Sequence, residues 1–284
     1  MQQLNSSNNS LTTSIPTGNL VASIVMAICF MLGVPGNIAV VVRLAGWLKG
    51  GSFTPRLMLS LAISDLLTLL PLPVWIWTLL HGWVFGVVLC KLLSYLLYFC
   101  MHCSILCVVL MSIQRYMQVL HPQKWNKLGR KGKKILLSGI WILSGVISSY
   151  APPKEEEAAL VQRTPSTNEE RKLQCKQCYQ NNVQTVATLI LEIIILMVSF
   201  LTLAYFYFRC HRGVNNSTFF STNLITKLVI RIMACFFIFW IPFHIINIVL
   251  IIAVLLENAS LLRSIEAADN ITTALVFING CVDP

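Results

Sequence analysis

One stretch, residues 90–116, limits the possible folds of this chain more than any other. It reads CKLLSYLLYFCMHCSILCVVLMSIQRY and is apolar over most of its length. A helix of about 25 residues spans about 37 Å, which is enough to cross a hydrocarbon core of about 30 Å at a tilt. A helix on the surface of a soluble domain is amphipathic instead. The stretch therefore predicts a membrane-spanning helix with Cys90 at one face and Arg115 at the other.

The composition also indicates a membrane protein. Of the 284 residues, 56% are hydrophobic and 11% are charged, whereas soluble domains have roughly 25% charged residues. The net charge of +10 lies in short clusters between apolar segments, as it does in cytosolic loops. We therefore expect no nucleic-acid partner. Nothing in the sequence resembles a Ser/His/Asp or Cys/His catalytic set, so we do not expect an enzyme.

Seven apolar segments predict an all-α fold, a seven-transmembrane helix bundle. They cover about 20–42, 57–80, 90–119, 134–150, 183–208, 224–256 and 265–284. The predicted domains are an N-terminal tail over 1–19 and a seven-helix domain over 20–284, with a second outer loop at about 151–182. Residues 1–18 are polar and contain no signal peptide, so the first helix is expected to act as the insertion signal.

The charged residues between these segments predict the orientation. Most lysines and arginines fall within 43–56, 115–134 and 209–231, and the loops in these ranges contain no acid. The acidic clusters at 155–157 and 257–269 fall in loops on the opposite side of the membrane. The positive-inside rule then places the N-terminus outside the cell in a multi-pass plasma-membrane protein. Sequons on that outer side predict glycosylation at Asn5, Asn8 and Asn258.

Two outer-loop cysteines lie within reach of the third segment. In an oxidising compartment either Cys175 or Cys178 can bond Cys90. The spacing to the fifth segment favours Cys175 slightly and leaves Cys178 open, and free thiols throughout are the alternative. Most of the other cysteines fall inside apolar segments, where cysteine is usually a small hydrophobe.

Some polar residues fall inside apolar segments, where such residues are costly and usually functional. Asp65 is the clearest case, and Glu192 in the outer half of the fifth segment faces either the bundle or a ligand. Four further residues lie at depths that could converge on Asp65: Asn37, Ser104, Asn279 and Asp283. Two carboxylates with neutral oxygen donors can hold a small hard cation such as sodium. A hydrogen-bonded network with a protonated acid and trapped water is the alternative.

The sixth segment contains a proline within FFIFWIPF. Phe236 and Trp240 precede Pro242 and lie one turn apart on the same face. Proline removes a backbone hydrogen bond and kinks a helix, so a bent helix with a large aromatic at its bend is a candidate two-state element. Simple packing is the alternative interpretation of the aromatic pair.

Together these residues resemble a rhodopsin-like G-protein-coupled receptor, from the first segment to the last residue. The matching stretches are GN at 36–37, LAISD at 61–65, WVFG at 83–86, Cys90, QRY at 114–116, Trp141, Phe236 with Trp240 and Pro242, and DP at 283–284. Within that family the chain is most similar to the leukotriene B4 receptors, through CKQCY at 175–179, LE at 191–192 and IPFHIIN at 241–247. Neighbouring chemoattractant peptide receptors share several of these stretches.

The chain departs from the family pattern at four places. Gln114 replaces the acid that normally precedes the arginine, which removes a carboxylate partner from Arg115. Ser199 and Phe200 stand where the family has proline, and Thr185 and Asp269 lie near positions where cations are expected. The sequence ends at Pro284, before the family's eighth helix and cytosolic tail, so a truncated non-signalling receptor form is an alternative.

The resemblance implies a receptor for an extracellular lipid mediator that signals through the sixth helix to a heterotrimeric G protein. A chemoattractant peptide is the alternative agonist. A transporter would predict internal repeats or broken helices at mid-membrane, and the sequence has neither. Apart from surrounding membrane lipid and an allosteric sodium ion, no cofactor is expected.

The residues expected to bind the ligand fall into three chemical groups. An apolar slot is predicted from Tyr95, Tyr98, Met101, Trp240 and Phe243, and polar partners from His102, Glu192, His244 and Asn247. Lys154 is the expected cation for a lipid carboxylate, with Lys176 and Arg263 behind it. The expected switch and coupling residues are Arg115, Tyr116, Trp240 and Pro242.

Overall fold

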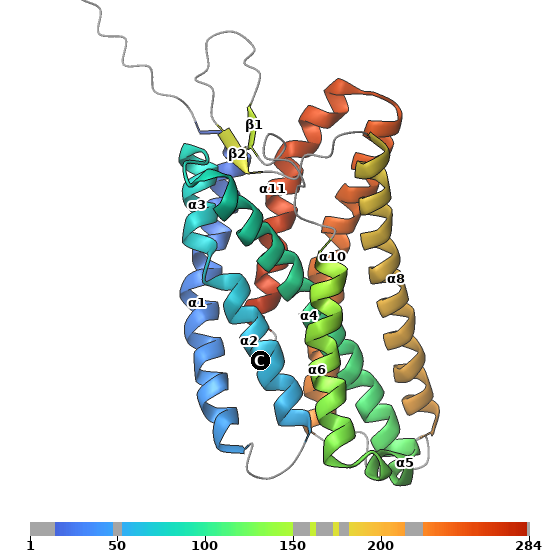
Figure 1. Cartoon of the computed structure of the whole chain (residues 1–284). Helices are drawn as coiled ribbons and strands as arrows, with labels where there is room; N and C mark the ends of the chain where they lie inside the picture. Colours follow the sequence, from blue (N-terminus) through green and yellow to red (C-terminus); the bar gives the residue numbers. More distant parts are fainter. Residues whose placement is uncertain are drawn as a thin grey trace, which may run out of the picture.

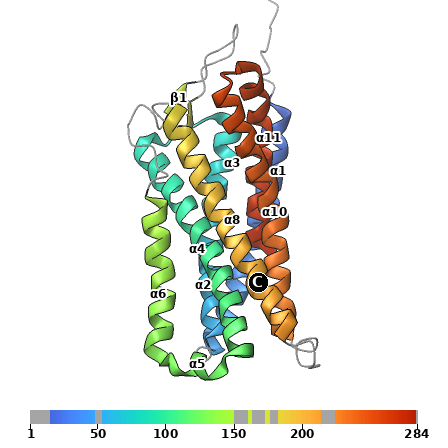
Figure 2. The same cartoon turned by 90° about the vertical axis from the view of Figure 1, so that its right-hand side faces the viewer.

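The predicted helices form a bundle in which the long elements run side by side (Figures 1 and 2). The computed structural model describes residues 15–47, 53–149, 160–162, 173–175, 182–213 and 224–282. Its helices are α1 (Thr17–Trp47), α2 (Thr54–Leu69), α3 (Leu72–His81), α4 (Gly86–Leu120), α5 (Pro122–Lys127), α6 (Gly129–Ser148), α8 (Asn182–Gly213), α10 (Leu224–Leu255) and α11 (Ala259–Val282). Each of the seven predicted segments corresponds to a helix, the second as α2 followed by α3. The predicted seven-helix fold is therefore confirmed.

The second predicted segment is interrupted near its middle. Pro71 and Pro73 have no backbone N–H, so neither can donate to the carbonyl one turn earlier, and α2 ends at Leu69 before α3 begins at Leu72. α3 ends at Gly82, whose φ of 90° is a conformation that glycine adopts readily. The indole N–H of Trp83 then donates to the Gly86 carbonyl at 2.8 Å, which closes the turn into α4.

Two short strands lie in the long loop between α6 and α8. β1 (Leu160–Gln162) pairs antiparallel with β2 (Leu173–Cys175), with Leu160 opposite Cys175. The hairpin lies over the end of the bundle where α4 begins (Figure 1). We call this the hairpin end and the opposite end, which carries α5, the α5 end.

The disulfide joins Cys90 to Cys175 across 85 positions of sequence, with 5.7 Å between the two Cα atoms. This confirms the predicted bond and identifies Cys175 as the partner of Cys90. Cys178 lies outside the described residues. Cys90 is fully buried against Trp83, together with partly buried apolar residues of α3 and α4. The bond therefore attaches the hairpin to a buried part of this end of the bundle.

The distribution of side chains is the reverse of that in a soluble domain. Large apolar side chains such as Val42, Ile135 and Val183 are at least 70% exposed on the outside of the bundle, whereas Asn37 and Asp65 are at most 3% exposed within it. Hydrocarbon favours this arrangement because it solvates apolar surface and cannot hydrogen-bond polar groups.

Among the described residues, five helical stretches are long and apolar enough to cross a membrane. They are Thr17–Trp47, Thr54–His81, Gly86–Leu120, Val183–Phe206 and Phe237–Leu255. The other two predicted segments are α6 and α11, and each carries charges near its first turns, at 130–134 and 263–269. These charges lower the hydropathy of two helices that nevertheless pack as full members of the bundle.

A glycine sets the distance between three helices. A Cβ on Gly33 of α1 would lie 2.7 Å from a methyl carbon of Leu69 in α2 and 2.8 Å from the sulfur of Cys281 in α11. Small residues allow helices to approach closely in a membrane, where dispersion contacts contribute much of the association energy. α1 can pack against both neighbours because this position has no side chain.

The disulfide leads to a first prediction. Cys90→Ser and Cys175→Ser should each strongly reduce surface expression and lower the melting temperature, because the unbonded hairpin segment would regain conformational entropy. Cys178→Ser is the matched control and should leave both quantities unchanged. Peptide mapping of non-reduced surface protein provides the direct check, and a Cys90–Cys178 peptide would contradict the assignment.

Candidate ligand and switch sites

One face of α10 gathers four of the ten residues predicted to bind ligand. Trp240, Phe243, His244 and Asn247 recur at the three- and four-residue spacing that places side chains on one side of a helix. The rings of Trp240 and His244 stack with centroids 5.9 Å apart, and Phe243 meets both edge-on. Met101 of α4 packs against the same group.

Glu192 of α8 faces this group across the bundle. Its Oε2 accepts a hydrogen bond of 3.4 Å from the amide nitrogen of Asn247, and Asp269 of α11 is close enough to interact with it electrostatically. Glu192, His244 and Asn247 are all buried. We call these three residues the Glu192 cluster.

The Glu192 cluster contains polar atoms that the described residues leave unsatisfied. Glu192 Oε1 and both ring nitrogens of His244 are buried without a hydrogen-bond partner among the described residues. Buried polar atoms are almost always hydrogen-bonded in proteins, and exceptions of this kind gather at functional sites. The cluster can therefore accept and donate hydrogen bonds to a molecule that enters between α8 and α10.

Two other predicted ligand residues contact α6, and a third stacks on one of them. The Tyr95 hydroxyl donates to the Gly145 carbonyl at 3.3 Å, and His102 Nδ1 lies 2.8 Å from the Ser148 hydroxyl. The ring of Tyr98 stacks on that of His102. The structure thus divides the predicted ligand set between the α8–α10 face and the α4–α6 face. Lys154, Lys176 and the side chain of Arg263 lie outside the described residues.

Asp65 lies in a buried polar network between α1, α2, α4 and α11. The Ser104 hydroxyl is 3.4 Å from Asp65 Oδ1 and 3.1 Å from the Ser64 hydroxyl, which donates to the Cys100 carbonyl at 2.8 Å. The Asn37 amide nitrogen donates to the carbonyls of Gly280 at 2.7 Å and Gly33 at 2.9 Å. A Cβ on Gly280 would meet Asp65 at 3.5 Å. Asn279 is buried beside this position, and Asp283 lies outside the described residues.

The oxygen donors of this network fit a small hard cation. Asn37 uses its amide nitrogen for two carbonyls, and its Oδ1 is buried without a donor among the described residues. A carboxylate, a hydroxyl and an amide oxygen are ligands that such cations prefer. Among the described residues, no group of three or more His, Cys, Asp or Glu side chains is arranged to hold a metal ion, and the described partners of Asp65 in this network are neutral.

At the α5 end, Gln114 joins α4 to α2. Its amide nitrogen donates a 2.7 Å hydrogen bond to the Thr54 hydroxyl, and both residues are buried. Next to it, the Tyr116 hydroxyl lies 3.3 Å from His121 Nε2, and its ring packs on Phe206 of α8. The position that an acid occupies in the family pattern therefore holds a neutral link between two helices.

α10 runs from Leu224 to Leu255 with Pro242 inside it. Pro242 cannot donate to the Ile238 carbonyl, which leaves one backbone bond missing beside Trp240. The side chain of Phe236 lies outside the described residues. The predicted bend at this point stays a prediction.

Asn258 lies just before α11 and is exposed. Its side-chain oxygen accepts hydrogen bonds from the Ser260 hydroxyl at 2.8 Å and the Leu261 backbone N–H at 3.1 Å, as an N-cap residue does. Asn5 and Asn8 lie outside the described residues, so glycosylation at all three positions stays a prediction.

Sequence reasoning missed one polar site near the α5 end. Arg209 and Arg212 line a cavity with Tyr116 and His121. The signal was present, because two arginines three residues apart directly follow the fifth apolar segment. Their spacing places them on one helix face.

These features define a class of protein: a multi-pass membrane protein whose helices enclose polar sites at several depths. The sequence profile of the 7 transmembrane receptor (rhodopsin family) matches residues 36–284. The chain belongs to this family, which is one of receptors and not of enzymes. An extracellular agonist and a G protein are the partners that family membership implies.

Curated relatives align over nearly the whole chain. Leukotriene B4 receptor 1 of Homo sapiens is 28% identical over 273 residues, which cover 94% of this chain and 75% of the relative. C5a anaphylatoxin chemotactic receptor 1 of Cavia porcellus is 30% identical over 274 residues, 94% of this chain and 76% of the relative. The same receptor of Oncorhynchus mykiss is 28% identical over 278 residues, again 94% and 76%.

The Gln114–Thr54 contact leads to a second prediction. Gln114→Asp should lower basal G-protein activation by about fivefold, because an acid can form an ion pair with Arg115 that exceeds a neutral hydrogen bond by about 1 kcal/mol. Gln114→Asn has the shape of the Asp variant without its charge, and its basal G-protein activation should stay near that of the parent. The measurement is nucleotide exchange by a reconstituted G protein. Equal or higher output from the Asp variant would refute the argument.

Proposed function

We propose that this chain is a plasma-membrane chemoattractant receptor whose hairpin end faces outward, and that its agonist is an amphipathic lipid carboxylate of the leukotriene B4 type. The observation that carries the proposal is the Glu192 cluster, a buried polar group stacked against Trp240. The human relative named for leukotriene B4 supports the agonist class. With this orientation Asn5, Asn8 and Asn258 are extracellular and available for glycosylation.

The chemistry of the pocket favours hydroxyl groups near α8. Met101, Trp240 and Phe243 offer apolar surface for a hydrocarbon chain, which is the usual lining of a small-molecule site. A ligand hydroxyl can donate to Glu192 Oε1 and exchange a hydrogen bond with His244. A carboxylate at the same place would be repelled by Glu192 and Asp269.

The acid group of the ligand therefore has to bind elsewhere. Burying an unpaired carboxylate is costly, and Lys154 follows closely after the end of α6 at the hairpin end. We assign Lys154 to the ligand carboxylate, with Lys176 and Arg263 as neighbouring cations. Tyr95, Tyr98 and His102 would line the route between this cation and the apolar slot along α4.

Trp240 connects the ligand site to the rest of α10. An agonist that packs against Trp240 and bonds the Glu192 cluster prefers one arrangement of α10 over another, and it shifts the equilibrium by that difference in affinity. The backbone bond missing at Pro242 lets the two halves of the helix change their relative angle. The movement would open a cleft near Arg115 and Tyr116, where a G protein binds.

A chemoattractant peptide is the second candidate agonist. The specific observation in its favour is the pair of acids, Glu192 and Asp269, which could hold a cationic side chain. Two of the relatives compared are named for the C5a anaphylatoxin. The variants Glu192→Gln and Lys154→Ala, described next, distinguish the two agonist classes.

The third prediction tests the agonist. Glu192→Gln should weaken leukotriene B4 binding about fivefold, because it replaces a carboxyl oxygen that can accept the ligand hydroxyl by an amide nitrogen, and one hydrogen bond contributes about 1 kcal/mol. A leukotriene analogue without hydroxyls should bind the parent and Glu192→Gln equally. Glu257→Gln removes an exposed acid near the same end and serves as the control. Radioligand binding to membranes is the measurement.

The carboxylate end is tested separately. Lys154→Ala should weaken the acid far more than its methyl ester. If the parent binds neither lipid, or if a cationic peptide binds and loses affinity in Glu192→Gln, the lipid proposal is replaced by the peptide one.

A fourth prediction concerns the proposed sodium site formed by Asp65, Asn37, Ser104, Asn279 and Asp283. An ion that binds only the inactive arrangement stabilises it by mass action, so sodium should lower agonist affinity several-fold in the parent. Asp65→Asn should abolish this effect. Choline chloride at equal ionic strength is the control. Equal insensitivity of the parent and Asp65→Asn would identify the network as a water-filled one.

A further inference from the structure

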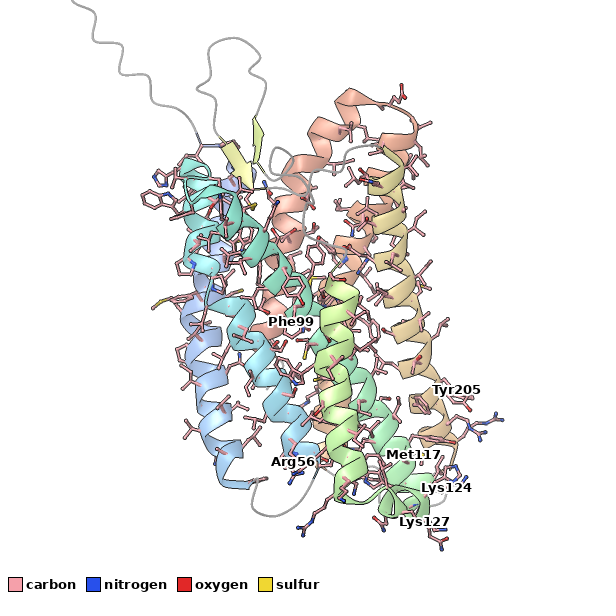
Figure 3. The ribbon with its side chains drawn as sticks, viewed as in Figure 1. Arg56, Phe99, Met117, Lys124, Lys127 and Tyr205 are labelled. Carbon is pink, nitrogen blue, oxygen red and sulfur yellow. A yellow bond between two sulfur atoms is a disulfide. The ribbon has the colours of Figure 1, made fainter. Side chains whose placement is uncertain are left out.

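A cavity of about 450 Å³ lies at the α5 end, between α4 and α8. The described residues that line it are Tyr116, Leu120, His121, Arg209 and Arg212, and we call it the basic cavity. Figure 3 shows Lys124 and Lys127 of α5 and Tyr205 of α8 at the same end of the bundle. Its described lining residues come from α4, α8 and the turn after α4, and it shares Tyr116 with the cleft proposed to open for a G protein.

The groups in the basic cavity are hydrogen-bond donors suited to an anion. Arg209 and Arg212 are both exposed and lie on one face of α8. The guanidinium of Arg212 lies over the Phe208 ring at 5.3 Å, which limits its range of positions. Tyr116 and His121, 3.3 Å apart, add a phenol and an imidazole.

The stretches of sequence around these cations contain no carboxylate that could pair with them. Residues 115–134 and 205–235 contain no Asp or Glu. Lys124 and Lys127 add further positive charge on the side of α5. The potential in the basic cavity is therefore positive, and it attracts anions from the adjoining solvent and membrane surface.

The depth of the basic cavity matches that of lipid headgroups. The apolar span of α8 ends at Phe206, and at 1.5 Å per residue Arg209 and Arg212 follow within about 10 Å. Tyr205 and Phe208 beside them are 54% and 55% exposed, as expected for side chains that face hydrocarbon. A ligand in this cavity can thus keep an acyl chain in the membrane while its headgroup reaches the arginines.

We propose that the basic cavity binds a phosphate monoester, carried by a phosphorylated inositol lipid of the membrane leaflet at the α5 end. Arginine pairs with phosphate oxygens through two parallel N–H bonds, and the Tyr116 hydroxyl can donate a further one when His121 Nε2–H donates to it. The leaflet is cytosolic if the orientation under the proposed function is right, and the binding chemistry is independent of the agonist.

The test uses the full chain in nanodiscs of phosphatidylcholine with a small fraction of phosphatidylinositol 4,5-bisphosphate. Both faces of a nanodisc are open, so the result does not depend on orientation. Native mass spectrometry should show retention of the phosphorylated lipid by the parent. Arg209→Gln with Arg212→Gln should reduce retention more than tenfold, because the direct charge-assisted hydrogen bonds of both arginines to phosphate are lost.

Arg43→Gln with Arg56→Gln is the matched control. It removes the same charge from α1 and α2. Figure 3 shows Arg56 at the same end of the bundle, to the left of Lys124 and Lys127. This control should retain the lipid, and both double variants should melt like the parent in pure phosphatidylcholine. Tyr116→Phe provides a single-atom variant with a smaller expected loss, should the double variant prove unstable.

Three outcomes would overturn the proposal. They are no retention by the parent, equal losses in the two double variants, and saturation of the cavity by soluble inositol trisphosphate with an affinity equal to that of the lipid. The last result would identify a free phosphate compound as the ligand in place of a membrane lipid. Agonist binding at the hairpin end is measured separately, so failure of either proposal leaves the other standing.

Discussion

Hydrogen bonding inside the bundle is the constraint on which the rest of the structure depends. In hydrocarbon a polar group can be satisfied only by another part of the protein. The buried amide of Asn37 therefore bonds backbone carbonyls in α1 and α11, and the Ser64 hydroxyl bonds a carbonyl of α4. These bonds fix the rotation of each helix about its axis, which apolar surface alone would leave loosely determined.

α4 carries a member of every site described. Cys90 anchors the hairpin, Met101 touches the Trp240 group, Ser104 reaches Asp65 and Tyr116 lines the basic cavity. These residues lie along one continuous helix of 35 residues, so the distances between the sites are set by its rise. A ligand that tilts or rotates α4 changes all of these environments together, which is a physical basis for coupling between the two ends.

The helices and their order could be predicted because apolar length and charge bias are direct consequences of the bilayer. The pair of candidate cysteines and the grouping around Asp65 were also visible in the residues. The direction in which α4 residues face was not, since a helix that is apolar on all sides has no periodicity to separate its lipid side from its helix-facing side. His102, for example, directly follows Met101 in the sequence, yet His102 contacts α6 and Met101 packs against α10. The sequence pattern does not separate these two directions. The basic cavity was missed because it depends on how α8 packs against α4.

The interruption between α2 and α3 divides one apolar segment into two helices that make different contacts. α2 carries Thr54 and Asp65, which face α4, whereas Trp75 of α3 packs against Trp83 beneath the hairpin. Because Pro71 and Pro73 leave two backbone bonds out of the ladder between α2 and α3, the two helices are joined less rigidly than the turns of one regular helix. The part of the segment beneath the hairpin can therefore adjust its orientation with less effect on the network around Asp65.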